Sequence, residues 1–216
     1  MDGQTTSAYL LNRIVEETRQ IVDKSLPDVR SFVGNVLWAD FDLNEPECKS
    51  LPVVSRLSIS DMRPDEMTAP LVEAILAAKD ILYWQQSYSV SDGFDDDYLN
   101  RYGWFNLISP DGVFVSDDLR VSVGYWGEGL YYKEHWHEPE EIYLVLSGAA
   151  TFISQGRAPR ACSVGDTVFH ESNQPHAIDM TPGPLLAMSF WRGNSLLAKP
   201  GLPEGKDDEG KGASAI

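Results

Sequence analysis

The chain has 216 residues, of which 43% are hydrophobic, and its formal net charge at pH 7 is -16. A chain of this length can bury most of its apolar surface within one domain. The strong negative charge argues against nucleic acid and anionic membrane surfaces as partners, because both are themselves negative. An anionic substrate would need a local cation to overcome this field, and a bound metal ion would supply one.

The ends and cysteines of the chain indicate a compartment. The first residues lack a basic segment followed by an apolar run, and no apolar stretch approaches the ~20 residues of a membrane span. Cys48 and Cys162 are too few for a disulfide framework. We therefore expect a cytoplasmic protein with reduced thiols, no secretory signal and no membrane partner.

The N-terminal third has the periodicity of helices. Apolar residues recur at helical spacing over residues 7–25, where Thr6 or Ser7 is the expected N-cap and Pro27 ends the run. A second, short helix is predicted over residues 29–38.

A third helix follows a proline-punctuated stretch, residues 39–62, that we interpret as loop. This helix begins at Thr68-Ala-Pro70 and carries a long apolar stripe to Leu82. The helical stripes are expected to pack on the rest of the fold or on a second subunit and to carry no chemistry. Residues 87–103 show no clear period and are interpreted as a solvated linker, since three consecutive aspartates cannot all face one ion.

From residue 104 onward the pattern changes to short β-rich runs between turn residues, which is typical of an antiparallel barrel or jelly roll. The domain prediction is therefore a helical extension and linker over 1–103, a barrel over 104–198 and a tail over 199–216. The tail lacks apolar content and is expected to be disordered. The predicted strands span residues 104–108, 112–115, 119–126, 130–137, 142–147, 149–153, 161–164, 167–170, 176–180 and 185–191.

Within the barrel region, chelating side chains are concentrated. The chain has four histidines, and all of them fall between His135 and His176. His135 and His137 point the same way in an extended strand, and Glu141 shares their parity if the strand resumes after Pro139. This spacing predicts a metal-binding face; the alternative is a pair of surface histidines beside an acidic residue.

The flanking residues complete a recognisable motif. The stretch matches the first cupin motif, G-x(5)-H-x-H-x(3)-E-x(6)-G, at Gly129, His135, His137, Glu141 and Gly148. The chain therefore resembles the cupin superfamily. The resemblance implies a mainly β fold, the double-stranded β-helix or jelly-roll barrel, with an N-terminal helical extension.

The second cupin motif, G-x(5)-P-x-G-x(2)-H-x(3)-N, is matched at Gly165 and at His176. Asn173 replaces the second glycine of the motif, and asparagine tolerates positive φ better than most residues. His176 is thus the predicted fourth metal ligand. Three positions depart from the motif: Glu171, Asn173 and Met180.

The predicted ligands suit a divalent transition metal. Three imidazoles and one carboxylate are compatible with Zn, Fe(II), Mn or Ni, and the sequence does not choose among them. A bound divalent ion polarises a substrate carboxylate or carbonyl and eases removal of the neighbouring C–H proton. Tyr143, two residues past Glu141 on the same strand face, is the candidate base, because a nearby cation favours the phenolate. The alternative is a tyrosine that only packs in the barrel.

The run H-x-H-x(3)-E-x-Y resembles the cupin-type dimethylsulfoniopropionate (DMSP) lyases of marine bacteria. The resemblance implies that Tyr143 takes the proton α to the substrate carboxylate, after which dimethyl sulfide leaves and acrylate remains. It also implies that Tyr132 and Trp191 line the substrate pocket, where aromatic faces suit a sulfonium cation. Strand parity instead turns Tyr131 toward the metal, so Tyr131 and Tyr132 are both candidates.

Other functions fit the same ligand set. A cupin dioxygenase, a metal-dependent isomerase acting on a small carboxylate and a non-catalytic small-molecule-binding cupin are the alternatives. The expected partner is a small zwitterionic sulfonium carboxylate, and a homodimer is the candidate assembly. His170, Glu138 and Glu140 receive no role and are assigned to the surface.

Overall fold

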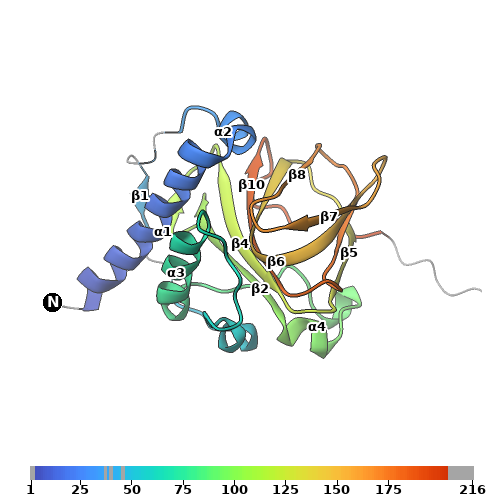
Figure 1. Cartoon of the computed structure of the whole chain (residues 1–216), viewed down its shortest axis with the longest axis horizontal. Helices are drawn as coiled ribbons and strands as arrows, with labels where there is room; N and C mark the ends of the chain where they lie inside the picture. The colour runs from blue at the N-terminus through green and yellow to red at the C-terminus, as the bar shows by residue number, and fades with distance from the viewer. Residues whose placement is uncertain (1–2, 37, 39–40, 45–46, 204–216) are drawn as a thin grey trace, which may run out of the picture.

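The structure, a computed structural model, describes residues 3–36, 38, 41–44 and 47–203. A β-barrel forms one half of the molecule and helices lie against one side of it (Figure 1). The helices are α1 (Gly3–Ser25), α2 (Pro27–Val33), α3 (Ala69–Ala78) and α4 (Asp96–Asn100), with short 3-10 turns η1 (Pro52–Arg56), η2 (Lys79–Ile81) and η3 (Val90–Asp92). No described helix has both the length and the apolar character needed to cross a membrane.

The strands form an antiparallel jelly roll, apart from one short parallel pair between β2 and β3. They run in the order β1-β3-β2-β4-β10-β6-β9-β5, and β7 and β8 also pair with β6. The predicted cupin fold is confirmed. The strands are β1 (Asp42–Leu43), β2 (Tyr102–Ser109), β3 (Phe114–Val115), β4 (Arg120–Trp126), β5 (Tyr131–His135), β6 (Glu140–Ser154), β7 (Arg160–Ser163), β8 (Thr167–His170), β9 (His176–Asp179) and β10 (Leu185–Arg192).

Strand β6 joins the two halves of the barrel. The two strands predicted over residues 142–147 and 149–153 form this single strand. Its first part pairs with β8 and β10, and its second part pairs with β7 and β9. Between them Gly148 has φ 85°, and a Cβ there would lie 1.7 Å from the carbonyl oxygen of Pro184. Only glycine allows this close approach, which explains the glycine at the end of the first cupin motif.

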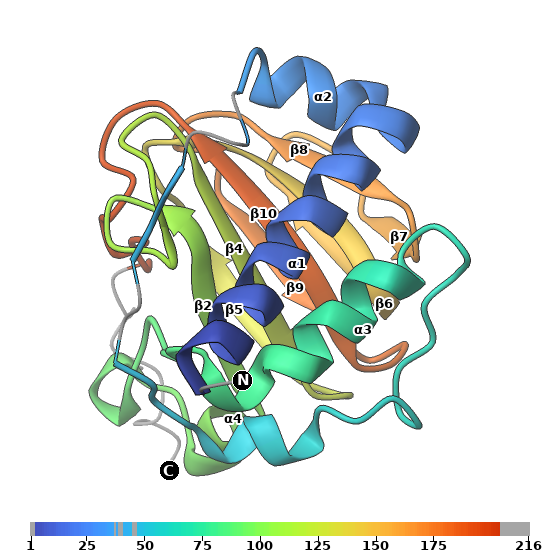
Figure 2. The same ribbon diagram turned by 90° about the vertical axis from the view of Figure 1, so that its left-hand side faces the viewer.

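The helices cover the outer face of the sheet formed by β2, β4, β10 and β6 (Figure 2). Ile14 and Val22 of α1 and Ile75 of α3 share one buried cluster with Leu144 and other outward side chains of the sheet. Burying apolar surface in this way removes it from water, at roughly 25 cal/mol per Å². The expectation that the helical stripes pack on the barrel is confirmed.

Alternation along β6 separates this outer core from the barrel interior. Ile142 and Leu144 belong to the outer cluster, whereas Tyr143 and Val145 belong to a second cluster inside the barrel. Side chains of odd-numbered residues near the start of β6 therefore face inward. Glu141 shares this parity with Tyr143, as the sequence predicted.

The segment over residues 87–103 is not a solvated linker, and this prediction is wrong. Tyr88, Phe94, Tyr98 and Tyr102 are all buried and join the inner cluster. The segment contains η3 and α4, and the side chain of Asp95 caps α4 by accepting a 2.7 Å hydrogen bond from the amide of Tyr98. The aspartates therefore mark a helix start, and short helical turns explain the missing periodicity.

Other predicted boundaries also shift. Helix α1 begins earlier than expected. Helix α2 ends at Val33 instead of residue 38, and the next residue, Gly34, has φ 72°. The predicted loop over residues 39–62 contains β1 and η1. The start of the tail is ordered, because Gly201 exchanges backbone hydrogen bonds with Trp136. Residues 204–216 of the predicted disordered tail lie outside the described residues.

Candidate functional site

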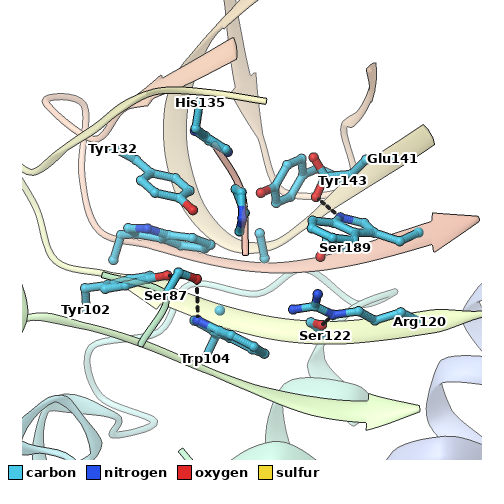
Figure 3. A pocket seen from close by; sticks show the side chains of 15 residues that line it. Ser87, Tyr102, Trp104, Arg120, Ser122, Tyr132, His135, Glu141, Tyr143 and Ser189 are labelled. Carbon is cyan, nitrogen blue, oxygen red and sulfur yellow. Dashed lines mark hydrogen bonds between the residues drawn. The ribbon is translucent and has the colours of Figure 1, made fainter. Parts of the chain in front are cut away.

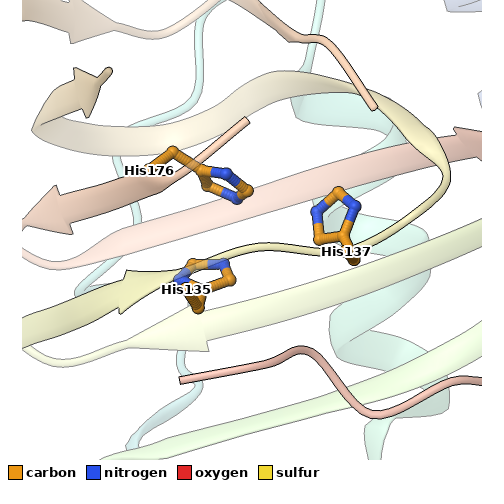
Figure 4. A group of neighbouring side chains, drawn as sticks. All are labelled: His135, His137 and His176. Atoms are coloured by element: carbon orange, nitrogen blue, oxygen red, sulfur yellow. The ribbon is translucent and has the colours of Figure 1, made fainter. Parts of the chain in front are cut away.

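His135, His137 and His176 converge inside the barrel. His135 ends β5, His176 begins β9, and the two stand opposite each other in the antiparallel register. His137 follows two residues after His135, and one ring nitrogen from each of the three lies within 4.8 Å of the others (Figure 4). All three are 5% exposed or less. The predicted histidine cluster is thus present and buried.

Backbone carbonyls orient all three rings. A carbonyl oxygen can only accept, so each Nδ1 must carry the hydrogen, and in the neutral ring Nε2 is the atom with a lone pair for a metal. The Nε2 atom of His176 is buried without a hydrogen-bond partner within the described part of the chain. Such a set of oriented imidazoles is what a divalent metal requires. The acceptors are Lys133 O at 2.8 Å for His135, Pro139 O at 2.9 Å for His137 and Gln174 O at 2.8 Å for His176.

Glu141 brings a carboxylate to the same cluster. Its Oε2 lies 3.2 Å from Nε2 of His137 and 3.4 Å from Nε2 of His176. Burial alone would raise the pKa of Glu141, but the neighbouring histidines, His137 foremost, hold it well below its ordinary value. Burial also lowers the pKa of His135 well below its ordinary value. Lone pairs of nitrogen and oxygen that face each other need a cation between them, so the residues fit a bound metal ion.

His170 is the site residue that the sequence reasoning missed. It is fully buried rather than on the surface, and its Nδ1 lies 3.3 Å from Oε2 of Glu141. Strand β8 pairs with β6 so that His170 stands directly opposite Glu141, and its ring stacks on His176 at 3.9 Å. Burial lowers its pKa to about 4. Glu141, His170 and His176 form a second possible ligand group. Glu138 and Glu140, in contrast, are exposed as expected.

Tyr143 lies beside this cluster. Its side chain is 5% exposed and its ring centroid is 5.8 Å from that of His170. Burial raises the pKa of Tyr143 well above its ordinary value, and the negative charge of Glu141 raises it further. A phenol in this position is kept protonated by its surroundings unless positive charge is added.

A cavity of about 40 Å³ adjoins the cluster and opens among aromatic and polar side chains (Figure 3). Two of the predicted pocket residues, Tyr132 and Trp191, line it together with Tyr143, Glu141 and His135. The remaining lining residues are Ser87, Tyr102, Trp104, Arg120, Ser122, Gly124, Trp126, Ala187, Ser189 and Pro200.

The structure distinguishes the two tyrosine candidates. Tyr132 is 4% exposed and its ring is 4.1 Å from that of His135, whereas Tyr131 is 48% exposed and lies outside the pocket lining. The register between β5 and β9 shifts between Tyr132 and His135, where three residues of β5 span two of β9. This β-bulge reverses the parity of the strand. Parity counting therefore pointed to the wrong tyrosine.

Trp191 lines the pocket and also contacts Glu141, His137 and Arg120. Its Nε1 donates a 2.6 Å hydrogen bond to Oε1 of Glu141. One face of the indole stacks on the His137 ring at 4.0 Å, and the other face carries the guanidinium of Arg120 at 4.3 Å. Both faces of the indole are therefore occupied by side chains, while Trp191 lines the pocket as predicted.

Three other rings provide an aromatic end to the pocket. The centroids of Tyr102, Trp126 and Tyr132 lie 5.5–5.8 Å from one another. Tyr102 was not among the predicted pocket residues, because it falls at the end of the supposed linker. Trp126 belongs to a predicted strand. The side chains carry no formal charge, and ring faces attract cations.

Comparison with known proteins agrees with this geometry. Residues 31–187 match the family model for dimethylsulfoniopropionate lyase. The chain is 38% identical over 140 residues to the DMSP lyase DddQ of Ruegeria pomeroyi, covering 63% of this chain and 69% of that protein.

Solved structures show the same likeness. One chain from the crystal structures of the DMSP lyases RdDddP and RnDddQII is 34% identical, with a TM-score of 0.86 over 92% of this chain and 100% of its own. The crystal structure of DddQ from Ruegeria pomeroyi DSS-3 is 31% identical, with a TM-score of 0.82 over 91% of this chain and 98% of its own. The chain therefore belongs to the dimethylsulfoniopropionate lyase family.

Proposed function

We propose that this chain cleaves DMSP to dimethyl sulfide and acrylate by base-catalysed β-elimination at the buried histidine and glutamate cluster. Membership of the family makes the chain a carbon–sulfur lyase. The single observation that supports this assignment of the site is a buried set of oriented imidazoles and a carboxylate beside a tyrosine and an aromatic pocket.

One divalent metal per chain would be held by His135, His137, Glu141 and His176, with His170 beside them. The nitrogen and oxygen donors suit Zn, Fe(II), Mn or Ni. When bound, the metal supplies positive charge that binds and polarises the substrate carboxylate and favours the phenolate of the neighbouring tyrosine. The backbone carbonyls behind the three imidazoles keep the rings in the ligand orientation.

Tyr143 is the proposed base. Its phenolate oxygen takes the proton from the carbon next to the substrate carboxylate, and that C–H electron pair becomes the new C=C bond. The C–S bond breaks at the same time and its electron pair leaves with dimethyl sulfide, so acrylate remains. Tyr143 ends the step protonated and returns the proton to solvent. Its burial keeps competing water away from the reacting carbon.

The sulfonium end of the substrate lies at the aromatic end of the pocket. Tyr132, Tyr102 and Trp126 line this end and carry no formal charge. A sulfonium has no N–H donors, and ring faces stabilise cations by about 0.5–2 kcal/mol depending on desolvation. The pocket thus separates an aromatic end from the cluster that binds the carboxylate.

The test replaces Tyr143 with Phe, which removes the proton acceptor and keeps the ring. Tyr143→Phe is expected to retain metal and to lose dimethyl sulfide release by ~10²–10⁴-fold. Tyr131→Phe is the matched control: it removes the same oxygen from a tyrosine on β5, but Tyr131 is exposed and should keep parental turnover. Headspace dimethyl sulfide and elemental analysis measure both. Near-parental turnover in Tyr143→Phe would show that another group takes the proton.

The remaining sequence-based expectations stay predictions. A cupin dioxygenase would consume oxygen during turnover, so an oxygen electrode separates that alternative from the lyase. Oligomeric state and cytoplasmic location are open to gel filtration and fractionation. The pocket favours a zwitterionic substrate. Neutral aromatic rings line one end, where the sulfonium cation fits, and the cluster proposed to bind the metal and the carboxylate lies at the other end.

A further inference from the structure

Arg120 is a buried cation whose role the elimination does not require. It lies at the start of β4 with 7% of its surface exposed. Its guanidinium is stacked between two tryptophans, 4.7 Å from the Trp104 ring centroid and 4.3 Å from that of Trp191. Figure 3 shows the guanidinium turned toward the interior of the pocket, with Ser122 beside it. Stacking fixes the plane of the guanidinium and so the directions of its donors.

The hydrogen bonds of Arg120 leave one side of the guanidinium open. Nε donates to Asn106 Oδ1 and to Ser122 Oγ, each at 3.0 Å, and Nη1 donates to the carbonyl oxygen of Leu196 at 2.8 Å. Nη2 has no partner among the described residues. These bonds explain how the side chain is held, but the acceptors are neutral.

The charge of Arg120 is also not paired directly. Arg120 takes part in none of the ion pairs formed among the described residues. Asp111 reaches it only through Asn106, whose Nδ2 donates a 2.8 Å hydrogen bond to Asp111 Oδ1. Glu141 lies at the Nε1 edge of the Trp191 indole, whose ring face carries the guanidinium of Arg120. A buried charge without a direct counter-ion is costly, and a bound anion would remove that cost.

Arg120 stands where two cavities meet. It lines the inner cavity next to the histidine cluster and also a second cavity of about 190 Å³, which reaches Lys199. Ser87, Trp104 and Pro200 line both cavities as well. These four shared residues therefore form the neck between the outer and the inner space. Among the described residues that line the inner cavity, Arg120 is the one lysine or arginine.

We propose that Arg120 is a carboxylate-binding residue at this neck, which binds monocarboxylates as they pass between the outer cavity and the inner site. A fixed guanidinium with a free edge binds a carboxylate by charge-assisted hydrogen bonds. In a chain of net charge -16 such a cation is what lets an anionic group approach the site. For a zwitterion it also repels the sulfonium, which directs that end toward the aromatic rings. This subsite is separated by the Trp191 indole from the cluster that holds the metal.

The first test measures binding of propionate, which has no leaving group, to the metal-loaded full chain by calorimetry. Arg120→Gln is expected to weaken propionate binding at least tenfold and to leave the binding of neutral propionamide unchanged. The control variant is Arg157→Gln, which removes the charge of an exposed arginine outside the pocket lining. It should bind propionate as the parent does. If Arg120→Gln binds propionate within twofold of the parent at equal metal content, the metal-containing cluster alone accounts for carboxylate binding and the proposal is wrong.

A second pair of variants tests the idea without removing the arginine. Ser122→Asp places a carboxylate beside Nε of Arg120 and supplies the missing counter-ion. The variant therefore folds without leaving a buried charge unpaired. Ser122→Asn has nearly the same shape and no charge. The internal carboxylate should compete with propionate, so Ser122→Asp is expected to bind it at least tenfold more weakly than Ser122→Asn. Equal binding by the two variants would overturn the proposal. Both measurements are of binding, so their outcome is independent of which residue acts as the base.

Discussion

The hydrogen bond from Trp191 to Glu141 predicts how strongly a residue outside the ligand set controls metal binding. Trp191→Phe removes the Nε1 donor that lies 2.6 Å from Oε1 of Glu141, and the smaller ring can still stack on His137. Oε1 is then a buried carboxylate oxygen without its donor. A hydrogen bond to a charged group contributes about 1.5–3 kcal/mol. Since 1.36 kcal/mol corresponds to a factor of ten, metal affinity should fall by roughly 10–150-fold.

This range agrees with the ~10–100-fold losses that follow when the partner of a metal ligand is removed. The measurement is a competition titration against a chromophoric chelator, with dimethyl sulfide release at saturating metal as a second readout. Saturating metal should restore part of the turnover, because the ligands themselves are intact.

The matched control is Trp84→Phe. Trp84 is fully buried and its Nε1 also donates one hydrogen bond, to the carbonyl oxygen of Lys79 at 2.9 Å, but it lies in the outer cluster under the helices. It should lower the free energy of unfolding and leave metal affinity unchanged. Parental metal affinity in Trp191→Phe, or an equal loss in both variants, would refute the reasoning.

Three further predictions follow from particular residues. Replacing both His135 and His137 with Ala should abolish stoichiometric metal, and elemental analysis showing full occupancy would contradict the ligand assignment. In chelator-treated protein the folded state keeps His170 neutral down to a pKa of about 4, against the ordinary 6.5. The contribution of His170 to the free energy of unfolding should therefore be complete above pH 6.5 and be lost as the pH drops toward 4, by about 3 kcal/mol. Urea unfolding of His170→Asn should show a shallower loss of stability with falling pH. An unchanged pH dependence would show that His170 is not its cause. Asn173 has φ 57°, so Asn173→Gly should unfold at nearly the parental urea concentration, while Asn173→Val should cost ~1–2 kcal/mol.

The histidine and glutamate cluster and the fold could be predicted from the sequence because both are encoded locally. The spacing from His135 to Glu141 places these side chains on one face of adjoining strands, and short alternating runs mark the barrel. Tyr143 was placed inside the barrel for the same reason. Gly148 was found as a motif position, and the structure adds that its neighbour across the strand is a backbone carbonyl.

What escaped prediction depends on pairing between distant segments. Tyr132 faces the pocket because of a bulge in the register between β5 and β9, and a single strand does not reveal a bulge. His170 faces Glu141 because β8 pairs with β6 across 29 residues. Tyr102 enters the pocket because the aromatic segment before it folds onto the barrel. In each case the missing information is which strand or loop lies alongside.

Stacked side chains bring these distant segments together at the site: Trp104, Arg120, Trp191 and His137. If Arg120 touched Glu141 directly, the two charges would neutralise each other, and neither would remain to bind a ligand. The Trp191 indole contacts both residues without letting them meet, since the guanidinium lies over its ring face and Glu141 binds at its Nε1 edge. Its edge hydrogen bond holds Glu141 in place. We infer that the tryptophan keeps a buried anion available for a metal and a buried cation available for a carboxylate, within one small pocket.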